Sequence, residues 1–534
     1  MEDNKVHTES GEGLLKCAGL IVIVILLSKV FGFLRDVVVA NYYGAGLVSD
    51  AYFYAYQIPA LAIVILGGMG GPFHSATVSV FSKLISDFTK KPNKDVKKLF
   101  NTFETFSILI FGLIALICFF FPTQVMNVII SQATPELSSK AAYLLKIMSP
   151  SIVVGALLGL YYGILVTYNK FLLPNIAPSA LSVGIVFTLF FTKGDDSGFY
   201  LAFGTLLGAL LQLIMQSPAV LKLGYTFKPC FEFFNNKNFK DILELLMPAF
   251  LSSTIGQIGI YVDIFFASGL SEGQWTAYGY ANRIFQFPTG LMLSALLVPL
   301  FPLFSRLVAK KEFDEVRYYF NKGVGSLIFV GTFMMIFIFI SRTDLISIAL
   351  ERGAFDSRAT FMVSEVLFYI SLSIIPYMFR DSITRLYYAF NDSKTPFYIA
   401  MGSILLKLIF NSLLVKPMGI NGIALSTTII TLINATLLAF LIRKKISIGY
   451  RHFMTQMAKI IFCALVAYVI GYFLNEFIAI YLNTSFILKI VKVLITFSVI
   501  FSIYISLSHL LKVEYLEDLK EKVEEKFCKR LKKN

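Results

Sequence analysis

Charge and catalytic side chains are scarce in this sequence. Only 15% of its 534 residues are charged, and it contains four His and one Trp. Three of the histidines, His7, His452 and His509, lie in or near tails, loops and the ends of apolar runs. Because enzymes need clustered acid, base or metal-binding groups, an enzyme embedded in a membrane is disfavoured.

Motifs for disulfide, metal and nucleotide chemistry are also missing. The five Cys residues are scattered without CxxC or metal-ligand spacing. The stretch GGMGG at residues 67–71 has neither the GxGxxG pattern nor the GK[ST] ending of nucleotide-binding loops. The opening MEDNKVHTES lacks the basic region of a secretory signal, so the first apolar run is expected to be an uncleaved anchor. We therefore expect no cofactor and no ATP hydrolysis by this chain.

Hydrophobic residues dominate instead. They make up 57% of the chain, and Phe alone occurs 53 times, a balance unlike that of a water-facing domain. A bilayer core about 30 Å thick takes about 20 apolar residues per helical crossing. The sequence therefore predicts an all-α polytopic membrane protein with about fourteen transmembrane helices, at 14–38, 51–82, 99–121, 141–168, 174–192, 198–222, 242–269, 276–305, 320–341, 361–390, 396–415, 420–442, 456–476 and 484–511.

Basic residues concentrate in alternate loops between these spans. Lys and Arg in short loops are retained in the cytoplasm, and the basic stretches here are 83–98, 222–240, 306–322, 443–451 and 520–533. On the other side, 342–358 is expected to be a loop in which three Arg are offset by three acids. We therefore expect both termini on the cytoplasmic side of the membrane. The net charge of +14 is scattered over loops, which disfavours nucleic-acid binding.

Two pairs of similar motifs indicate an internal repeat. AYFYAYQIP at 51–59 resembles AYGYANRIFQFP at 277–288, and YNKFLLP at 168–174 resembles FNDSKTP at 390–396. Duplicated helical bundles are typical of carriers that alternate access to a central site. We expect two six-helix lobes related by this repeat, divided as 1–13 (tail), 14–222 (N-lobe), 223–241 (linker), 242–443 (C-lobe), 444–511 (helices 13 and 14) and 512–534 (basic amphipathic tail).

The C-terminal tail has a helical apolar pattern. Apolar residues recur at three- and four-residue steps among Lys and Glu, at Leu516, Leu519, Val523, Phe527 and Leu531. This pattern predicts a short amphipathic helix on the inner leaflet, or alternatively a solvated tail.

The first apolar run holds charges that lipid does not tolerate. In SKVFGFLRD, the residues Ser28, Lys29, Gly32, Arg35 and Asp36 fall within an arc of about 120° on a helix. A charge at the bilayer centre costs about 2.5 to 3.5 kcal/mol. Several on one face indicate a water-filled cavity or paired burial, unless Arg35 and Asp36 simply pair at the membrane interface.

A second intramembrane cation, Arg283, lies in the run 276–305. Its nearest neighbour is Asn, not an acid, and a guanidinium suits phosphate oxygens. The simplest joint interpretation is a carrier with a cationic central cavity for an anionic substrate. The alternative is a structural pairing of Arg283 with Asp36, Asp50 or Asp263.

Longer motifs resemble a known family. SKVFGFLRDVVVANYYGAGLVSDAYFYAYQIP, RIFQFPTG, YNKFLLPNIAPSAL and FNDSKTPF resemble the MurJ (MviN) family of lipid II flippases, within the multidrug/oligosaccharidyl-lipid/polysaccharide exporter superfamily. The resemblance covers nearly the whole chain. It implies transport of undecaprenyl-pyrophosphate-linked disaccharide pentapeptide, lipid II, from the inner to the outer leaflet of a bacterial plasma membrane, for peptidoglycan synthesis.

The resemblance also implies roles for individual residues. Lys29, Arg35 and Arg283 stand at cationic positions of the family's cavity and would contact the pyrophosphate, while Asp36 and Asp50 match its cavity or gate acids. The sequence departs from the family after Pro59, where many members carry Arg and then Glu but this chain has Ile63 and Gly68. The glycine-rich turn is expected to break this helix. It would bring backbone N–H groups or His74 to the cavity, although His74 also suits helix packing.

The driving force is less visible in the sequence. Membrane potential or an ion gradient would have to bias the cycle. Asp263 lies in an apolar run and is a candidate Na⁺ or proton site, with Asn411 and Thr431 as neutral oxygen donors. The alternatives are pairing of Asp263 with Arg283, and polar packing between helices.

Three transport functions are compatible with these features of the sequence. A lipid II flippase is favoured over a flippase for another polyprenyl-linked glycan and over a MATE-like drug or cation antiporter, whose cavity should be acidic. Expected partners are lipid II, membrane lipids and cell-wall synthases.

Overall fold

The computed structural model describes residues 2–67, 71–85, 91–192, 195–233, 236–293, 297–446, 449–482, 485–518 and 520. Every regular element in this part of the chain is helical, as the apolar runs predict. The described chain forms two compact units. Unit 1 contains residues 1–276 and 352–355, and unit 2 contains residues 277–351 and 356–534.

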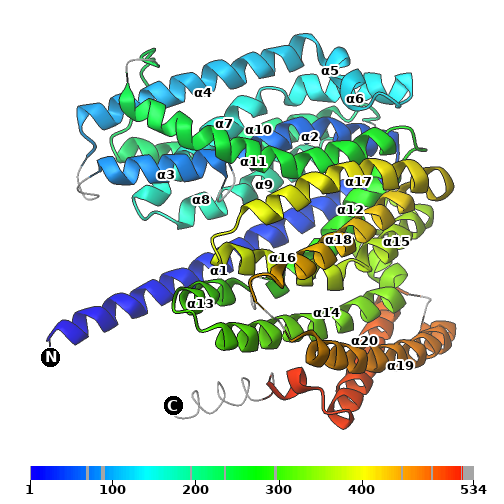
Figure 1. Ribbon diagram of the computed structural model, residues 1–534. Helices are drawn as coiled ribbons and strands as arrows, with labels where there is room; N and C mark the ends of the chain where they lie inside the picture. The colour runs from blue at the N-terminus through cyan, green and yellow to red at the C-terminus, as the bar shows by residue number, and fades with distance from the viewer. Residues whose placement is uncertain are drawn as a thin grey trace. The chain divides into compact units, whose positions relative to one another are not determined.

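Unit 1 is a bundle of helices labelled in Figure 1. It holds α1 (Glu2–Tyr43), α2 (Leu47–Gly67), α3 (Pro72–Leu84), α4 (Lys94–Phe120), α5 (Pro122–Ile129), α6 (Pro135–Met148), α7 (Ser151–Thr167), α8 (Leu172–Ile176), α9 (Pro178–Leu189), α10 (Phe199–Lys222) and α11 (Lys237–Ala267). Within it α7 packs against α2, α3, α4 and α10, so α7 is its central helix. α11 packs on α3, α2 and α4 in this unit, although its residues are expected to begin the C-lobe.

Unit 2 contains most of α12 (Gln274–Met292), whose first residues belong to unit 1. It continues with α13 (Val298–Ala309), α14 (Phe313–Leu350), α15 (Ser357–Ser371), α16 (Ile374–Ala389), α17 (Lys394–Met418), α18 (Ile420–Ile442), α19 (Tyr450–Leu482) and α20 (Phe486–Leu510). The division of the chain into two functional lobes stays a prediction.

The helices lie largely where the sequence predicts membrane spans, but the number of spans is less closely matched. In the described part of the chain, eight helices are long and apolar enough to cross a membrane, or ten if each bent pair is one span. The count of fourteen therefore stays a prediction. The expected break in the second span is confirmed, because α2 ends at Gly67 and α3 begins at Pro72. The expected loop 342–358 is wrong in its first half, because α14 continues to Leu350.

The internal repeat is confirmed by local geometry. α6 begins after Thr134, whose hydroxyl accepts a hydrogen bond from Leu137 N, and α15 begins after Asp356, whose carboxylate accepts one from Ala359 N. The capping residues Thr134 and Asp356 are 222 positions apart. Both helices then bend into the next, by 46° between α6 and α7 and by 45° between α15 and α16.

The repeated motifs also end these bent pairs in the same way. Asn169 follows α7 with φ of 57°, and Asn391 follows α16 with φ of 56°. In both places the next residue donates to the carbonyl five positions back, Lys170 N to Leu165 O at 2.8 Å and Asp392 N to Tyr387 O at 3.0 Å. Asn tolerates this left-handed conformation better than most residues, which explains why both copies of the motif carry it.

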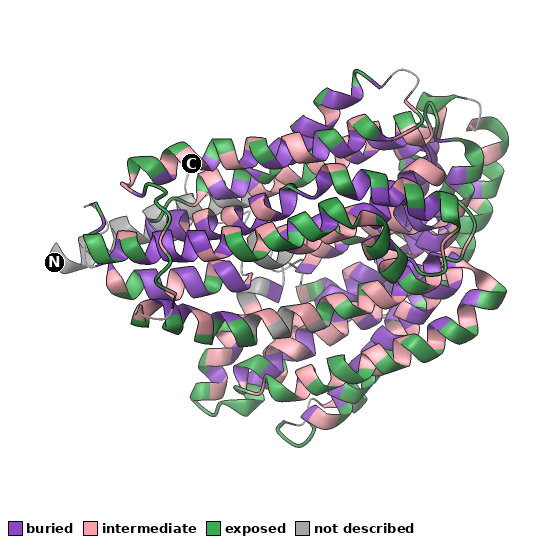
Figure 2. Ribbon diagram, turned by 90° about the horizontal axis from the view of Figure 1, so that it is seen from above, coloured by how far each residue is buried: buried purple, intermediate pink, exposed green. Residues whose placement is uncertain are grey.

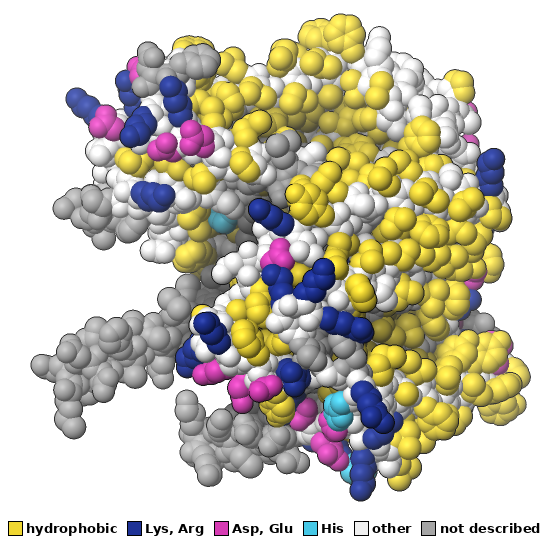
Figure 3. All heavy atoms as spheres, in the orientation of Figure 1, with side chains coloured by type: hydrophobic (Ala, Val, Ile, Leu, Met, Phe, Trp, Pro, Cys, Tyr) yellow, Lys and Arg dark blue, Asp and Glu magenta, His cyan; other side chains and the backbone are white. Residues whose placement is uncertain are grey.

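Many large apolar side chains point away from the helix packing. Only 11% of the apolar window of α17 and 22% of that of α20 is buried. In Figure 2, buried and exposed residues alternate along individual helices. In Figure 3, hydrophobic side chains are spread widely over the drawn face. Such large exposed apolar areas are unsuited to water, and they fit helices that face lipid.

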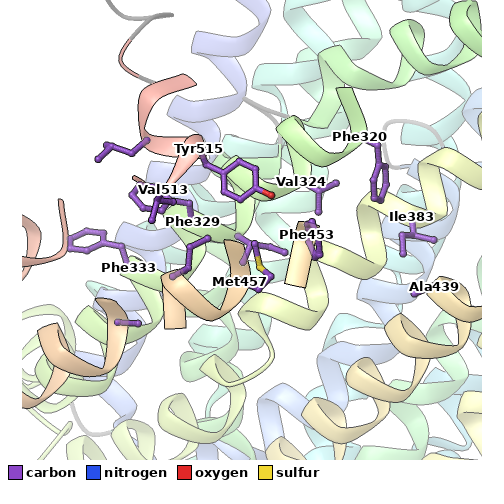
Figure 4. Packing of buried hydrophobic residues seen from close by; sticks show 14 of the residues in the cluster. Phe320, Val324, Phe329, Phe333, Ile383, Ala439, Phe453, Met457, Val513 and Tyr515 are labelled. Atoms are coloured by element: carbon purple, nitrogen blue, oxygen red, sulfur yellow. The ribbon is translucent and has the colours of Figure 1, made fainter. Parts of the chain in front are cut away.

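The core of unit 2 also holds the start of the C-terminal segment. Val513, Tyr515 and Leu516 are buried with Phe320 and Phe329 of α14, and Figure 4 shows several residues of this cluster. The Tyr515 ring lies so close to Gly325 that a Cβ there would stand 2.0 Å from Tyr515 Cε1.

The expected amphipathic tail helix is thus wrong for Leu516, which packs into protein and not onto the inner leaflet. Lys322 Nζ pairs with Asp518 at 2.5 Å and holds the same segment. The other members of the apolar pattern, Leu519, Val523, Phe527 and Leu531, lie outside the described residues.

Candidate functional site

The polar stripe of α1 is anchored on α8. Ser28 Oγ donates a hydrogen bond to the Asn175 carbonyl at 3.0 Å, and Asn175 Nδ2 donates to the Phe171 carbonyl at 2.7 Å. Asn175 belongs to the motif YNKFLLPNIAP. Lys29, the next residue of the stripe, is exposed. The stripe therefore combines one fixed hydroxyl with a cation that stands free of the helix packing.

Arg35 and Asp36 form an ion pair on α1. Arg35 Nε and Nη2 both donate to Asp36 Oδ1, at 3.0 and 2.9 Å. The side chains are 17% and 8% exposed, so the pair is largely buried. This pairing agrees with paired burial and also with simple pairing at the membrane interface, two of the alternatives that the sequence left open. An anion that binds Arg35 would have to compete with Asp36 for the same donors.

Asp50 is placed at the N-terminus of α12. Its Oδ2 accepts a hydrogen bond from Gly273 N at 2.6 Å, and its Oδ1 accepts from Thr276 N and Thr276 Oγ1 at 2.8 and 2.6 Å. The first N–H groups of a helix have no partner within the helix, and a carboxylate is favoured there by the helix dipole. Asp50 is 3% exposed. It thus acts as a helix cap supplied by α2, and its role as a gate charge stays a prediction.

His74 lies in the first turn of α3 and packs against α7. Its ring meets the Tyr162 ring edge-on, with centroids 4.8 Å apart. Tyr162 Oη in turn donates to Asn175 Oδ1 at 3.3 Å. The geometry corresponds to the packing role considered for His74, and it links α3, α7 and α8 to the residue that anchors Ser28.

Arg283 lies in unit 2, on α12. It is partly buried, and its guanidinium stands 5.9 Å from the centroid of the Tyr280 ring. Phe285, two residues further along α12, packs edge-on against Tyr377 of α16, with ring centroids 6.1 Å apart. Of the acids considered as its partners, Asp36 bonds to Arg35 and Asp50 bonds to the start of α12, both within unit 1.

The candidate cation-site residues are buried but belong to different units. Asp263 of α11, in unit 1, is 2% exposed, and Asn411 of α17, in unit 2, is 0% exposed. Thr431 of α18 donates its hydroxyl proton to the Thr427 carbonyl at 2.7 Å, which leaves its oxygen able to accept. Among the described residues no group of three or more His, Cys, Asp and Glu is placed to hold a metal ion. A joint site therefore stays a prediction.

Sequence reasoning missed a charged patch on α16. Arg380 Nη2 and Arg385 Nε approach the same carboxylate, Asp381, at 3.9 and 3.8 Å, and the Arg380 guanidinium lies 4.7 Å from the Tyr377 ring centroid. All three charged residues lie inside the predicted span 361–390. A search for charges inside predicted spans, which identified Arg283, would therefore have found them.

Two buried acids in unit 1 and unit 2 were missed as well. Glu104 of α4 accepts a hydrogen bond from Tyr161 Oη at 2.9 Å, and Asp344 of α14 pairs with Lys492 of α20 at 2.8 Å. Glu104 lies near the start of the predicted span 99–121, five residues after its first residue. Asp344 was not recognised as an intramembrane charge, because the helix that carries it was expected to end at residue 341.

Comparison with known proteins identifies one family for this chain. The model of the family described as lipid II flippase MurJ matches residues 39–492, which include most of both units. The chain belongs to this family.

Its relatives are similar over most of their length. A probable lipid II flippase MurJ from Synechocystis sp. is 29% identical over 82% of this chain and 83% of its own. Another, from Buchnera aphidicola, is 27% identical over 94% of this chain and 98% of its own.

Solved structures agree with this family. A structure of lipid II flippase MurJ in an inward closed conformation matches 92% of this chain and 99% of its own, with a TM-score of 0.76 and 25% identity. An inward-facing MATE-family multidrug transporter of the MOP superfamily matches 80% of this chain with a TM-score of 0.62 and 11% identity, which shows a shared fold. The chain is thus a multi-pass membrane transporter of the MurJ family.

Proposed function

We propose that this protein is a lipid II flippase, which moves undecaprenyl-pyrophosphate-linked peptidoglycan precursor from the inner to the outer leaflet by alternating access. The family match over residues 39–492 carries this proposal. Arg35 and Arg283, in the apolar runs of α1 and α12, support it, because a guanidinium in such a run favours an anionic substrate.

The proposed contacts of the pyrophosphate are Lys29, Arg35 and Arg283, with His74 as a further contact. In the structure Arg35 donates two hydrogen bonds to one oxygen of Asp36. A pyrophosphate offers more acceptor oxygens and more negative charge than one carboxylate, so it would displace Asp36 from Arg35. Release of Asp36 would then accompany substrate binding. Asp50 would hold the start of α12 in the state described here.

The proposed energy source is membrane potential or a gradient of Na⁺ or protons. Asp263, Asn411 and Thr431 are the proposed cation ligands, and all are buried. Both termini are proposed to face the cytoplasm, since the basic loops are retained there. Cell-wall synthases that use lipid II at the outer leaflet are proposed partners.

Complementation tests the function directly. Cells depleted of their own lipid II flippase would express this chain, and labelled lipid II would be measured at the outer leaflet. We expect restored growth and restored labelling. Correct insertion without either would overturn the proposal. Purified protein in liposomes that moved a different polyprenyl-linked glycan, or a cationic drug, would then identify the alternative.

A further inference from the structure

A buried acid of unit 1 has no role in the cationic site. Glu104 lies ten residues into α4, about 15 Å along the helix from its first residue. It is 2% exposed, and Tyr161 Oη of α7 donates a hydrogen bond to its Oε1 at 2.9 Å. Its other oxygen, Oε2, is buried and has no hydrogen-bond partner among the described residues.

The surroundings of Glu104 are aromatic. Phe100, one turn before it, packs on the Tyr161 ring with centroids 6.1 Å apart. Phe103 and Phe106 on either side of it meet Phe239 of α11, at 6.3 and 5.2 Å. A carboxylate ion held here would have one neutral hydroxyl as its partner. Burial of an ionised group without a compensating charge is costly, so the carboxyl holds a proton in this conformation.

Ionisable groups on the neighbouring elements face elsewhere. On α3, His74 packs on Tyr162, and on α6, Lys146 stands over the Phe119 ring at 5.1 Å, fifteen residues along α4. The first two turns of α11 carry four charged residues, all exposed: Lys237, Lys240, Asp241 and Glu244. The described part of α5 contains no charged residue.

The segment between α10 and α11 bonds to other residues of α4, and its Lys228 N donates to Asn101 Oδ1 at 3.4 Å. Cys230 N donates to Thr105 Oγ1 at 3.0 Å, and Thr102 Oγ1 contacts Cys230 Sγ at 3.3 Å. The nearest basic side chain of α4, Lys98, pairs with Glu232 of this segment at 2.6 Å. Tyr161 is therefore the ionisable group that the described structure brings to Glu104.

This geometry suits a proton and not a metal ion. Hard cations take six or more oxygen ligands, whereas one phenol oxygen is the only described polar partner of this carboxyl. The acid proton lies on Oε2, because Oε1 accepts from Tyr161. If Oε2 meets water in another conformation, its O–H bond breaks, the proton passes to water, and the Tyr161 hydrogen bond stabilises the carboxylate that remains.

We propose that Glu104 is a proton-carrying carboxyl of unit 1, which holds a proton in the conformation described here and releases it when Oε2 meets water. The proposal deepens the transport function above, on which it rests for the cargo. It differs from the candidate cation site at Asp263, which lies on another helix.

Infrared spectroscopy tests the proton independently of transport. Purified protein would be compared at successive pH values for the C=O band of a protonated carboxyl. We expect a band that is lost in Glu104→Gln and retained in Glu104→Asp and in the control Glu136→Gln, which alters an exposed acid of α6. Tyr161→Phe should make the band persist to higher pH, because the carboxylate loses its donor. An unchanged band in Glu104→Gln would overturn the proposal.

Transport in liposomes tests the coupling. Labelled lipid II movement would be measured with and without an imposed pH gradient, in the wild type and the same variants. We expect the gradient to change the rate severalfold in the wild type, Glu104→Asp and Glu136→Gln, but not in Glu104→Gln. Equal gradient dependence in Glu104→Gln, or none in the wild type, would overturn the coupling. If lipid II does not move at all, the transport function fails, while the infrared band still decides whether Glu104 holds a proton.

Discussion

Asp50 Oδ1 accepts hydrogen bonds from both the backbone N–H and the hydroxyl of Thr276, a residue 226 positions later in the chain. With the bond from Gly273 N to Oδ2, the carboxylate binds three donors at the start of α12. A side chain of α2 therefore fixes the first turn of a helix that begins in the same unit. The contact explains why an acid is needed at this position, in the first turn of the apolar helix α2.

Asp50→Asn should destabilise the protein by about 1.5–3 kcal/mol, the range for hydrogen bonds to charged groups. The amide keeps one acceptor, but its NH₂ group faces a donor and the negative charge at the helix N-terminus is lost. Thermal unfolding of purified protein in detergent measures the effect. Glu272→Gln is the matched control, because Glu272 is exposed and adjacent to the cap. Equal melting temperatures for Asp50→Asn and wild type would contradict the cap.

Arg35→Ala and Arg283→Ala should each lower lipid II transport tenfold or more. A charge-assisted hydrogen bond contributes about 1.5–3 kcal/mol, and about 1.4 kcal/mol is a factor of ten. The measurement is labelled lipid II movement in liposomes, at equal amounts of inserted protein.

A matched control removes an exposed cation, Arg358→Ala. Since Arg35→Ala also leaves Asp36 buried without its partner, the double variant Arg35→Ala/Asp36→Ala separates the two effects. It should regain stability but not transport. Wild-type rates in both single variants would argue against a cationic substrate site.

Lys492→Met should destabilise unit 2 by about 3–5 kcal/mol, because it leaves Asp344 buried without its ion partner. The two side chains are 5% and 10% exposed, and their atoms are 2.8 Å apart. Denaturant unfolding measures this loss. Lys492→Met/Asp344→Leu should recover most of it, since an apolar pair of similar size replaces the ions. Lys444→Met, at an exposed site, should have no effect. A double variant as unstable as the single one would show that the ion pair is not the cause.

Asp392→Asn should lower the melting temperature at neutral pH but not in acid. Partial burial alone would raise the pKa of Asp392, but hydrogen bonds from Thr395 and Lys445 hold it below the ordinary value of 3.8. A carboxyl whose pKa is lower in the folded state stabilises the fold above its unfolded pKa, and this stabilisation is lost as the pH falls through the folded pKa.

Melting temperatures at pH 7, 5 and below 4 check this sign, with exposed Asp241→Asn as the control. The gap between wild type and Asp392→Asn should be full at pH 7 and 5 and should shrink below about pH 4, as the wild-type carboxyl takes up its proton. A gap that widened in acid would mean that the pKa of Asp392 is raised and not lowered.

The sequence predicted the repeat down to single residues. The motif pair that contains Asn169 and Asn391 as second residues has both in the left-handed conformation, with the same backbone hydrogen bond after each. Such local signals depend on a few neighbouring residues, and sequence patterns read them well. The end of α14 was misplaced because Arg342 and Asp344 resemble loop residues until their partners, Glu365 and Lys492, are known.

The charged residues predicted for the site are buried or partly buried, apart from the exposed Lys29, and their roles stay predictions. Of their partners, the sequence suggested only Asp36 for Arg35. Arg35 pairs with its chain neighbour Asp36, whereas Asp50 reaches Thr276 and Glu104 reaches Tyr161, 57 positions away. Charge within an apolar run indicates that a partner is needed, since lipid supplies none. It does not indicate which helix supplies that partner.

Composition and the spacing of apolar runs by themselves determined a helical membrane protein, because both follow from the bilayer and from the rise of the helix. The paired motifs determined its repeated plan. Tertiary structure alone decided that Asp50 caps α12, that Leu516 enters the core of unit 2 and that Glu104 is buried beside a phenol. The physical reason is that each of these depends on which helix faces overlap in three dimensions. At these overlaps, residues far apart in the chain come into contact, and no periodic pattern in the sequence predicts which ones.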